Sequence, residues 1–309
     1  MLGCTCTRLS PRSIRSFSTT SLSYHSPNRT CPQPFILPPE HSQPSSSSSS
    51  SNAPNYPGHV QINAFQRGLL AVGSAFMGLI DTSRHDMIAV LSETTSGPFL
   101  PHLRSQMKRT LSGRRLLLER PRITEASIDL NKLEQMGENT FGRKYVEWLR
   151  RNKVTPDTRD PVRYIQDPEL AYIMQRYRES HDFYHVLLGF GVSLPAELVV
   201  KWFELSNFNL PVAALSSVFG PLRIEDSGER RRLWKTYGPW ALRAGGKAEC
   251  LIGVEWEKEW ETDIEELRTR FGVEKPPVGF GTFRKDERRI KAMRDEEEME
   301  KKRRRSGGV

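Results

Sequence analysis

Two histidines stand four residues apart, with an aspartate beside the first and a glutamate downstream. They are His181, Asp182, His185 and Glu197. Residues i and i+4 of a helix project from the same face, so both imidazoles can bind one ion. Asp182 is rotated by about 100° from His181, at the edge of that face. A turn over 189–195 is expected to bring Glu197 opposite His185, which predicts a metal site of two nitrogens and up to two carboxylates.

These ligand types suit Zn²⁺, and they also suit Fe²⁺ or Mn²⁺. Only one cysteine, Cys250, lies in the core, and the chain has no CxxC pair, so no thiolate is available to favour zinc. Asp182 can ligate directly or orient an imidazole from outside the ligand shell. Asp182 and Glu197 are also the carboxyl groups that can transfer a proton in a reaction at this site.

Two other site types fit the histidine–aspartate pair less well. An HD-type phosphohydrolase needs a further histidine well upstream, and residues 103–180 contain none. A di-iron carboxylate bundle needs two Glu-x-x-His motifs with further glutamate ligands, which this segment lacks. A mononuclear site is therefore predicted. His85 and Asp86 repeat the dipeptide without a second histidine four residues on, and they are interpreted as a helix-surface pair.

The elements that position the site are predicted to be helices. Asp167 is expected to cap a helix that starts at Pro168 and carries both histidines. Gly189 and Gly191 are expected to end that helix, and Ser193 can cap the next one. The core shows no repeat and no alternation of strands with helices, so its fold class is predicted to be all-α, as one domain with the metal site between two antiparallel helices.

Outside the site, the spacing of apolar residues leaves two segments less certain. Residues 94–101, with a glycine and two prolines, are expected to break the helical pattern. Residues 116–118 are interpreted as a strand or an ordered extended piece. Further helices are expected at about 62–92, 103–111, 130–136, 140–151, 212–219, 229–243 and 255–271.

Residues 68–80 carry no charge. A bilayer span needs about 20 apolar residues, so this stretch is too short to cross a membrane. A buried core helix is the favoured interpretation, and a helix that touches a membrane is the alternative. No other window is long enough to span, so any membrane contact is expected to be peripheral.

The ends of the chain differ from its core. Residues 1–17 belong to an arginine- and serine-rich segment without acids, the composition of a mitochondrial transit peptide, with a plastid address as the main rival. Residues 18–55 are expected to form a flexible linker rich in serine and proline. Residues 56–283 are expected to form the helical domain, and residues 284–309 a charged tail.

Most of the net charge of +9 lies in these ends. The arginines of the first 17 residues supply +3, and the tail supplies +4 from 11 bases and 7 acids. The remaining core is close to neutral. A nucleic-acid-binding function is not expected, because it requires several lysines and arginines that face phosphates.

The motif HDxxH followed after eleven residues by glutamate resembles the family of the fourth protein of the coenzyme Q (ubiquinone) biosynthesis complex. Supporting segments are ETTSGPFL (93–100), the stretch 163–185 that ends in RESHDFYH, and GVEWEKEW (253–260). The resemblance covers about residues 56–275. The serine run and the charged tail are additions that it does not explain.

The resemblance implies a metal site at His181, Asp182, His185 and Glu197, with zinc as the usual ion. It implies a peripheral protein on the matrix side of the mitochondrial inner membrane. The expected reaction is loss of the C1 carboxyl from a 4-hydroxy-3-methoxy-5-polyprenylbenzoate. Other enzymes of ubiquinone biosynthesis are the expected partners, which the protein would organise. The 68–80 helix and the 199–203 face are candidates for an apolar groove that holds the polyprenyl tail.

Two alternatives stay open at this point. The core can be a lipid-binding scaffold with a structural zinc, which a closed shell of four protein ligands would favour. An iron-dependent oxidative decarboxylation is the other, since the ligand types also suit Fe²⁺.

Overall fold

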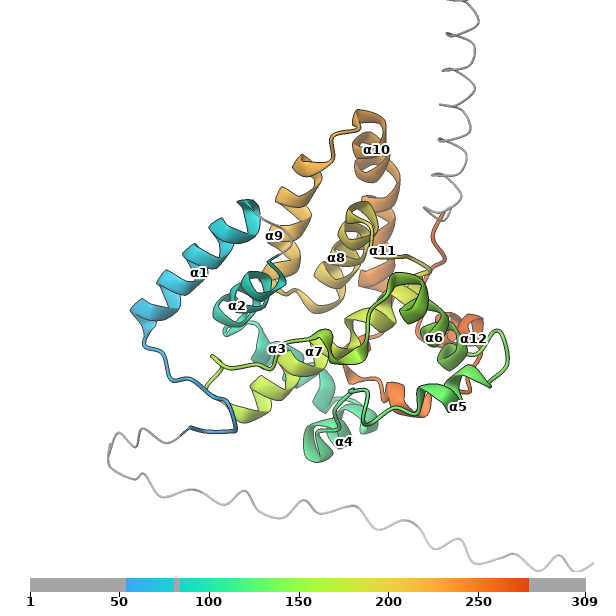
Figure 1. Cartoon of the computed structure of the whole chain (residues 1–309), viewed down its shortest axis with the longest axis horizontal. Helices are drawn as coiled ribbons and strands as arrows, with labels where there is room; N and C mark the ends of the chain where they lie inside the picture. The colour runs from blue at the N-terminus through green and yellow to red at the C-terminus, as the bar shows by residue number, and fades with distance from the viewer. Residues whose placement is uncertain (1–53, 81–83, 278–309) are drawn as a thin grey trace, which may run out of the picture. The chain divides into compact units, whose positions relative to one another are not determined.

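A computed structural model describes residues 54–80 and 84–277, and α7 (Pro168–Leu188) runs through the middle of the described bundle (Figure 1). Every residue of α7 from Ala171 to Leu188 is buried. The Asp167 carboxylate accepts hydrogen bonds from the backbone N–H groups of Glu169 and Leu170, at 2.8 and 3.2 Å. This confirms the predicted cap, with Pro168 in the first turn, where a missing N–H leaves nothing unsatisfied.

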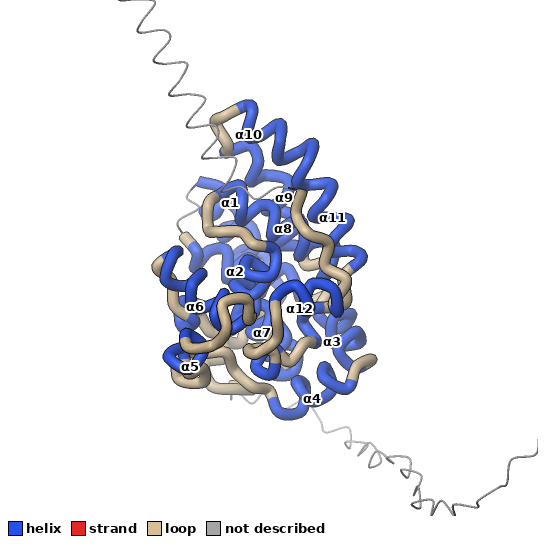
Figure 2. Tube along the Cα trace, turned by 90° about the vertical axis from the view of Figure 1, so that its right-hand side faces the viewer, coloured by secondary structure: helices blue, strands red, loops and turns tan. Residues whose placement is uncertain are grey.

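The described residues form no named strand, and only an isolated bridge joins Thr140 and Asp263 (Figure 2). The predicted all-α class is thus confirmed for the part of the chain that the structure describes. The remaining helices are α1 (Ala64–Ile80), α2 (His85–Ser96), α3 (Leu100–Lys108), α4 (Leu111–Glu119), α5 (Leu130–Glu134), α6 (Phe141–Asn152), α8 (Leu194–Phe208), α9 (Pro211–Phe219), α10 (Ser227–Arg232), α11 (Gly238–Lys247) and α12 (Ile264–Arg270).

The segment expected to break the helical pattern is much shorter than predicted. Helix α2 continues through Ser96, and α3 begins at Leu100, so only residues 97–99 interrupt the two helices. Pro101 lies in the first turn of α3, where proline is tolerated. Residues 116–118 were expected to be a strand or an extended piece, and that expectation is wrong. They lie in α4, whose N-terminus is capped by the Thr110 side chain.

Helix α1 is not the buried core helix that its uncharged sequence favoured. It packs on α2 and leaves one face uncovered. Side chains spaced along that face are between 60% and 80% exposed: Phe65, Leu69, Val72, Phe76 and Ile80. The uncharged segment 68–80 therefore lies at the surface and not in the core. Within the described residues, no helix has the length and apolar character to span a membrane.

Helices α8 and α11 approach each other closely through a glycine. A Cβ placed on Gly245 would lie 2.2 Å from the Phe203 carbonyl oxygen and 2.4 Å from Ser206 Oγ. Backbone atoms of a buried helix cannot move away cheaply, so this position excludes a side chain. The side-chain amide of Asn207 adds a second tie, since it donates to the Gly245 carbonyl at 2.8 Å. Helix α11 thereby fixes the back of α8, the helix that carries Glu197.

The expected transit peptide (1–17), nearly all of the expected linker (18–55) and the charged tail (284–309) lie outside the described residues. The proposed division of the chain into these parts stays a prediction.

Replacing Gly245 by alanine is expected to lower the free energy of unfolding by about 1–3 kcal/mol, because the new methyl group overpacks the contact between α8 and α11. Chemical denaturation of the purified protein measures this change. Gly246→Ala is the matched control, since the nearest atom to its added Cβ is 4.0 Å away. Equal stability of the two variants would contradict the close approach.

Candidate metal centre

The imidazoles of His181 and His185 meet on one face of α7, as their spacing predicted. Their Nε2 atoms are 3.1 Å apart, and the rings are nearly perpendicular. Both side chains are buried. Glu197, in the first turn of α8, places one carboxylate oxygen 3.3 Å from His181 Nε2 and the other 3.4 Å from His185 Nε2. The three residues together are a possible metal-binding group, in which no metal is identified.

The turn between α7 and α8 brings Glu197 to the two histidines. Gly189 ends α7 in the left-handed conformation with φ 77°, which glycine adopts without steric cost. Ser193 occupies the N-cap position of α8, as expected, but its side chain makes no capping hydrogen bond. Instead the Glu197 N–H donates to the Ser193 carbonyl at 2.9 Å, which closes the first turn of α8.

The two imidazole nitrogens and the Glu197 carboxylate lie close enough together to bind one metal ion. Bonds of about 2.0–2.1 Å to nitrogen or oxygen at a tetrahedral angle place two ligand atoms about 3.3 Å apart. The two imidazole nitrogens are 3.1 Å apart, close to that edge, and one Glu197 oxygen lies near each of them, at 3.3 and 3.4 Å. The Glu197 side chain is 34% exposed, so the triangle opens toward solvent on the glutamate side. The residues present can therefore hold one small divalent cation and leave a position for a further ligand.

Asp182 does not join this triangle. Its side chain is nearly inaccessible, and one of its oxygens accepts a hydrogen bond from Nη2 of Arg159. Arg159 follows a short 3-10 turn (Pro156–Thr158) that precedes α7 in the chain. The sequence offered no indication of this partner, because a lone arginine in a long loop has no characteristic spacing. The pair leaves three candidate ligands where the sequence allowed four.

Sequence reasoning also missed Glu204. This side chain is fully buried, and one oxygen lies 2.6 Å from His181 Nδ1. Its other oxygen accepts hydrogen bonds from Lys201 Nζ and Tyr177 Oη, each at 2.7 Å. Glu197, Lys201 and Glu204 are spaced i, i+4 and i+7, so they share one face of α8. That spacing was a signal in the sequence that could have revealed the second carboxylate.

Glu204 determines which nitrogen of His181 faces the site. A carboxylate that accepts from Nδ1–H leaves Nε2 with a free lone pair, as metal-ligating histidines require. Nε2 is the atom that faces His185 and Glu197. His185 lacks such support, since its buried Nδ1 has no hydrogen-bond partner among the described residues. The two imidazoles are thus held unequally.

The charges of the site favour ionised carboxylates. Burial alone would raise the pKa of Glu204, but Lys201 and His181 outweigh it and lower the pKa to about 2. Burial also opposes ionisation of Glu197, yet the two histidines hold its pKa well below the ordinary range. Burial and Lys201 lower the pKa of His181, while Glu204 and Glu197 raise it more, so the net shift is upward. A metal must displace a proton from His181, and its binding is expected to weaken as pH falls.

A buried ion pair holds the segment that follows Arg159. Arg178, on α7, donates to Glu93 of α2 at 2.7 Å and to the Asp160 carbonyl at 3.0 Å. The other oxygen of Glu93 accepts from the backbone N–H groups of Arg163 and Tyr164, at 2.8 and 2.7 Å. Helix α2 and helix α7 thus fix the loop that presents Arg159 to Asp182.

Comparison with known proteins identifies the family. The family described as coenzyme Q (ubiquinone) biosynthesis protein Coq4 matches residues 56–277. The chain belongs to this family. The resemblance seen in the sequence motifs is therefore confirmed, and the match includes every residue of the candidate centre.

Curated relatives agree over the same region. The ubiquinone biosynthesis protein COQ4, mitochondrial, of Laccaria bicolor is 51% identical over 224 residues, which are 72% of this chain and 75% of the relative. Its counterpart in Schizosaccharomyces japonicus is 48% identical over 225 residues, 72% of this chain and 94% of the relative. A solved structure of a candidate ubiquinone biosynthesis protein from Nostoc punctiforme shares the fold, with TM-score 0.55 and 21% identity over 69% of this chain and 99% of that one.

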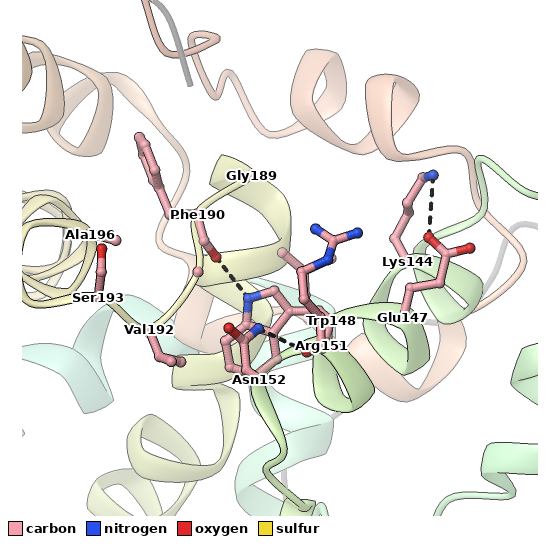
Figure 3. Close-up of a pocket in the computed structure, with 12 residues that line it drawn as sticks. Lys144, Glu147, Trp148, Arg151, Asn152, Gly189, Phe190, Val192, Ser193 and Ala196 are labelled. Carbon is pink, nitrogen blue, oxygen red and sulfur yellow. Dashed lines mark hydrogen bonds and ion pairs between the residues drawn. The ribbon is translucent and has the colours of Figure 1, made fainter. Parts of the chain in front are cut away.

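A cavity of about 460 Å³ adjoins the centre, between α6 and the turn that joins α7 to α8 (Figure 3). Trp148 forms part of its wall and packs against the His185 ring, with 5.4 Å between ring centroids. The Trp148 indole donates to the Phe190 carbonyl at 2.7 Å, and Ala196, next to Glu197, also lines the cavity. Residues 199–203 were expected to be candidates for lining an apolar groove. They do not line an open one, because four of the five are buried in the core.

Changing Glu204 to glutamine is expected to weaken zinc affinity about 10- to 100-fold, because the amide keeps the shape of the carboxylate but loses the charge that supports His181. Competition with a fluorescent chelator measures the affinity. Glu266→Gln, at an exposed position of α12, is the control for removal of one carboxylate. Unchanged affinity in a folded Glu204→Gln protein would contradict the supporting role.

Proposed function

We propose that this protein removes the C1 carboxyl group from a 4-hydroxy-3-methoxy-5-polyprenylbenzoate during ubiquinone biosynthesis, at a metal ion held by His181, His185 and Glu197. Membership of the Coq4 family supports the pathway. The observation that carries the chemistry is the convergence of two imidazole nitrogens, separated by about the edge of a tetrahedral site, with the Glu197 carboxylate. Zinc is the proposed ion, and the same ligand types also suit Fe²⁺ and Mn²⁺.

The number of ligands favours an enzyme over a scaffold with a structural zinc. Structural zinc sites are closed by four protein ligands, whereas catalytic sites keep one position open. Three candidate ligands converge here, and Arg159 engages the carboxylate of Asp182. The exposure of Glu197 provides access to the remaining position. A non-catalytic lipid-binding scaffold is the second candidate function, and the uncovered apolar face of α1 is the observation in its favour.

The proposed reaction consumes one proton and releases carbon dioxide. The proton adds to the ring carbon that bears the carboxylate, and the ring loses its aromaticity. The carbon–carboxylate bond then breaks, its electron pair restores the aromatic ring, and CO₂ leaves. A bound metal supplies a Lewis acid that orients the carboxylate. The reaction needs no oxidant or reductant in this form.

Within this scheme, the chain's own residues divide the work. His181 and His185 bind the ion, and Glu204 holds the His181 ring in the required tautomer. Asp182 and Glu197 are the proposed proton-transfer groups. The low pKa of Glu197 suits a ligand that stays ionised.

We also propose a peripheral position on the matrix side of the mitochondrial inner membrane, with other enzymes of ubiquinone biosynthesis as partners. The relatives named above are mitochondrial by name. The composition of residues 1–17 suits import. The exposed face of α1 offers apolar side chains to a bilayer surface or to a polyprenyl chain.

The proposed activity is tested with the full-length protein and a carboxyl-labelled, short-prenyl substrate. Zinc-loaded protein is expected to release labelled CO₂, and a chelator is expected to stop the release until zinc is restored. His185→Ala is expected to abolish both zinc binding and CO₂ release, since it removes one side of the ligand triangle. No release from metal-loaded protein would move the scaffold function ahead of the enzyme.

The proposed membrane face is tested with vesicles of phosphatidylcholine and cardiolipin. Leu69→Glu with Phe76→Glu is expected to weaken vesicle binding about tenfold or more, because each buried side chain of this size contributes about 1.5–3 kcal/mol. Leu111→Glu with Leu118→Glu is the matched control, since these leucines are at least as exposed but lie on α4. Co-sedimentation measures binding, and equal loss in both proteins would rule out α1 as the contact.

A further inference from the structure

Arg159 carries bonding capacity that its known partner does not use. One Nη2–H donates to Asp182, yet the Nε–H is buried and has no partner among the described residues. The side chain as a whole is 33% exposed. A guanidinium presents five N–H donors in a planar fork that matches a carboxylate. Arg159 therefore can bind an anion without being pulled out of the protein.

A second unpaired donor packs against Phe183, the residue after Asp182 on α7, with 4.9 Å between ring centroids. Tyr145, on α6, is fully buried, and its hydroxyl has no hydrogen-bond partner within the described part of the chain. Burial raises the pKa of Tyr145 well above its ordinary value, and the nearby Asp182 charge raises it further. The phenol is thus neutral and keeps its proton. Buried donors without partners can serve a ligand, and Arg159 Nε and the Tyr145 hydroxyl are two of the buried side-chain atoms without partners among the described residues.

Arg159 also interacts electrostatically with the carboxylates of the candidate metal centre. Burial alone would lower the pKa of Arg159, but Asp182 and then Glu197 and Glu204 outweigh it and raise the pKa. The carboxylates of the candidate site therefore act on the charge of Arg159, as Asp182 does. Glu197 and Arg159 are each about one-third exposed. Arg159 engages Asp182, which directly follows the candidate ligand His181, so an anion that replaced Asp182 on Arg159 would be bound next to the centre.

We infer that Arg159 binds the carboxylate of the aromatic substrate, exchanging Asp182 for it, with the Tyr145 hydroxyl as a second donor. The inference rests on the proposed function, since it names how that substrate is recognised. Without substrate, Asp182 keeps the guanidinium neutralised and aligned. With substrate, a planar pair of N–H bonds orients the carboxylate toward the ion. The product has no carboxylate, so Arg159 returns to Asp182 and product release is favoured.

A purely structural ion pair makes different predictions for the same variants. If Arg159 only neutralises buried Asp182, then removing both charges together repairs the defect of removing one. If Arg159 binds substrate, the double variant Arg159→Gln with Asp182→Asn folds normally but stays defective for carboxylate ligands. Asp182→Asn alone frees the guanidinium, and it is expected to bind a carboxylate ligand at least as well as the unaltered protein.

The experiment compares two ligands on full-length protein by calorimetry, with and without zinc. One is a short-prenyl 4-hydroxy-3-methoxybenzoate, and the other is the same phenol without its carboxyl group. Arg159→Gln and the double variant are expected to bind the benzoate about tenfold more weakly or worse, with unchanged binding of the phenol. Arg163→Gln, four residues along at an exposed position, is the matched control.

Two results would overturn the inference. One is recovery of benzoate binding in the double variant, and the other is an unaltered protein that shows no preference for the benzoate over the phenol. The outcome is separate from that of the proposed reaction. Selective benzoate binding through Arg159, in a protein that releases no CO₂, would support the inference and refute the decarboxylase.

Discussion

Helix α7 is buried on every side and still carries charged side chains, and this combination constrains the rest of the domain. An ionised group in a protein interior is costly unless another segment supplies a partner of opposite charge. The buried charged side chains of α7 therefore pair with residues from elsewhere in the chain. The pairs are Arg176 with Glu257, Arg178 with Glu93, Glu179 with Arg122, His181 with Glu204, and Asp182 with Arg159.

These pairs do more than offset the cost of burial, because each one fixes a separate element against the centre. Glu93 brings α2 and also binds the backbone of the loop after Arg159. Glu204 brings a later turn of α8 beside the same histidine that Glu197 approaches. The fold and the candidate metal centre are consequently one network. A change that weakens a pair far from the ion, such as the one at Arg178, also loosens the loop that presents Arg159.

The parts of the site that lie close in sequence could be predicted, and the parts that depend on distant segments could not. His181, His185 and Glu197 are related by one helix turn and one short reversal, so local geometry alone brings them together. Arg159 precedes its partner by 23 residues of loop and helix, and nothing local fixes that contact. The prediction that α1 is buried failed for a related reason. An uncharged helix can be buried in the core or can lie at the surface, and the packing of the rest of the chain determines which.

The ion pair between Arg159 and Asp182 links two properties that the proposed decarboxylase needs. Asp182 directly follows a candidate ligand, so a free carboxylate at this position would compete for the ion and tend to close its coordination shell. Arg159 engages that carboxylate and thus favours a three-ligand site with room for substrate. The same guanidinium is then next to the position that the substrate's carboxylate would take. In the proposed mechanism, one arginine outside the motif accordingly determines both how open the centre is and which charge it accepts.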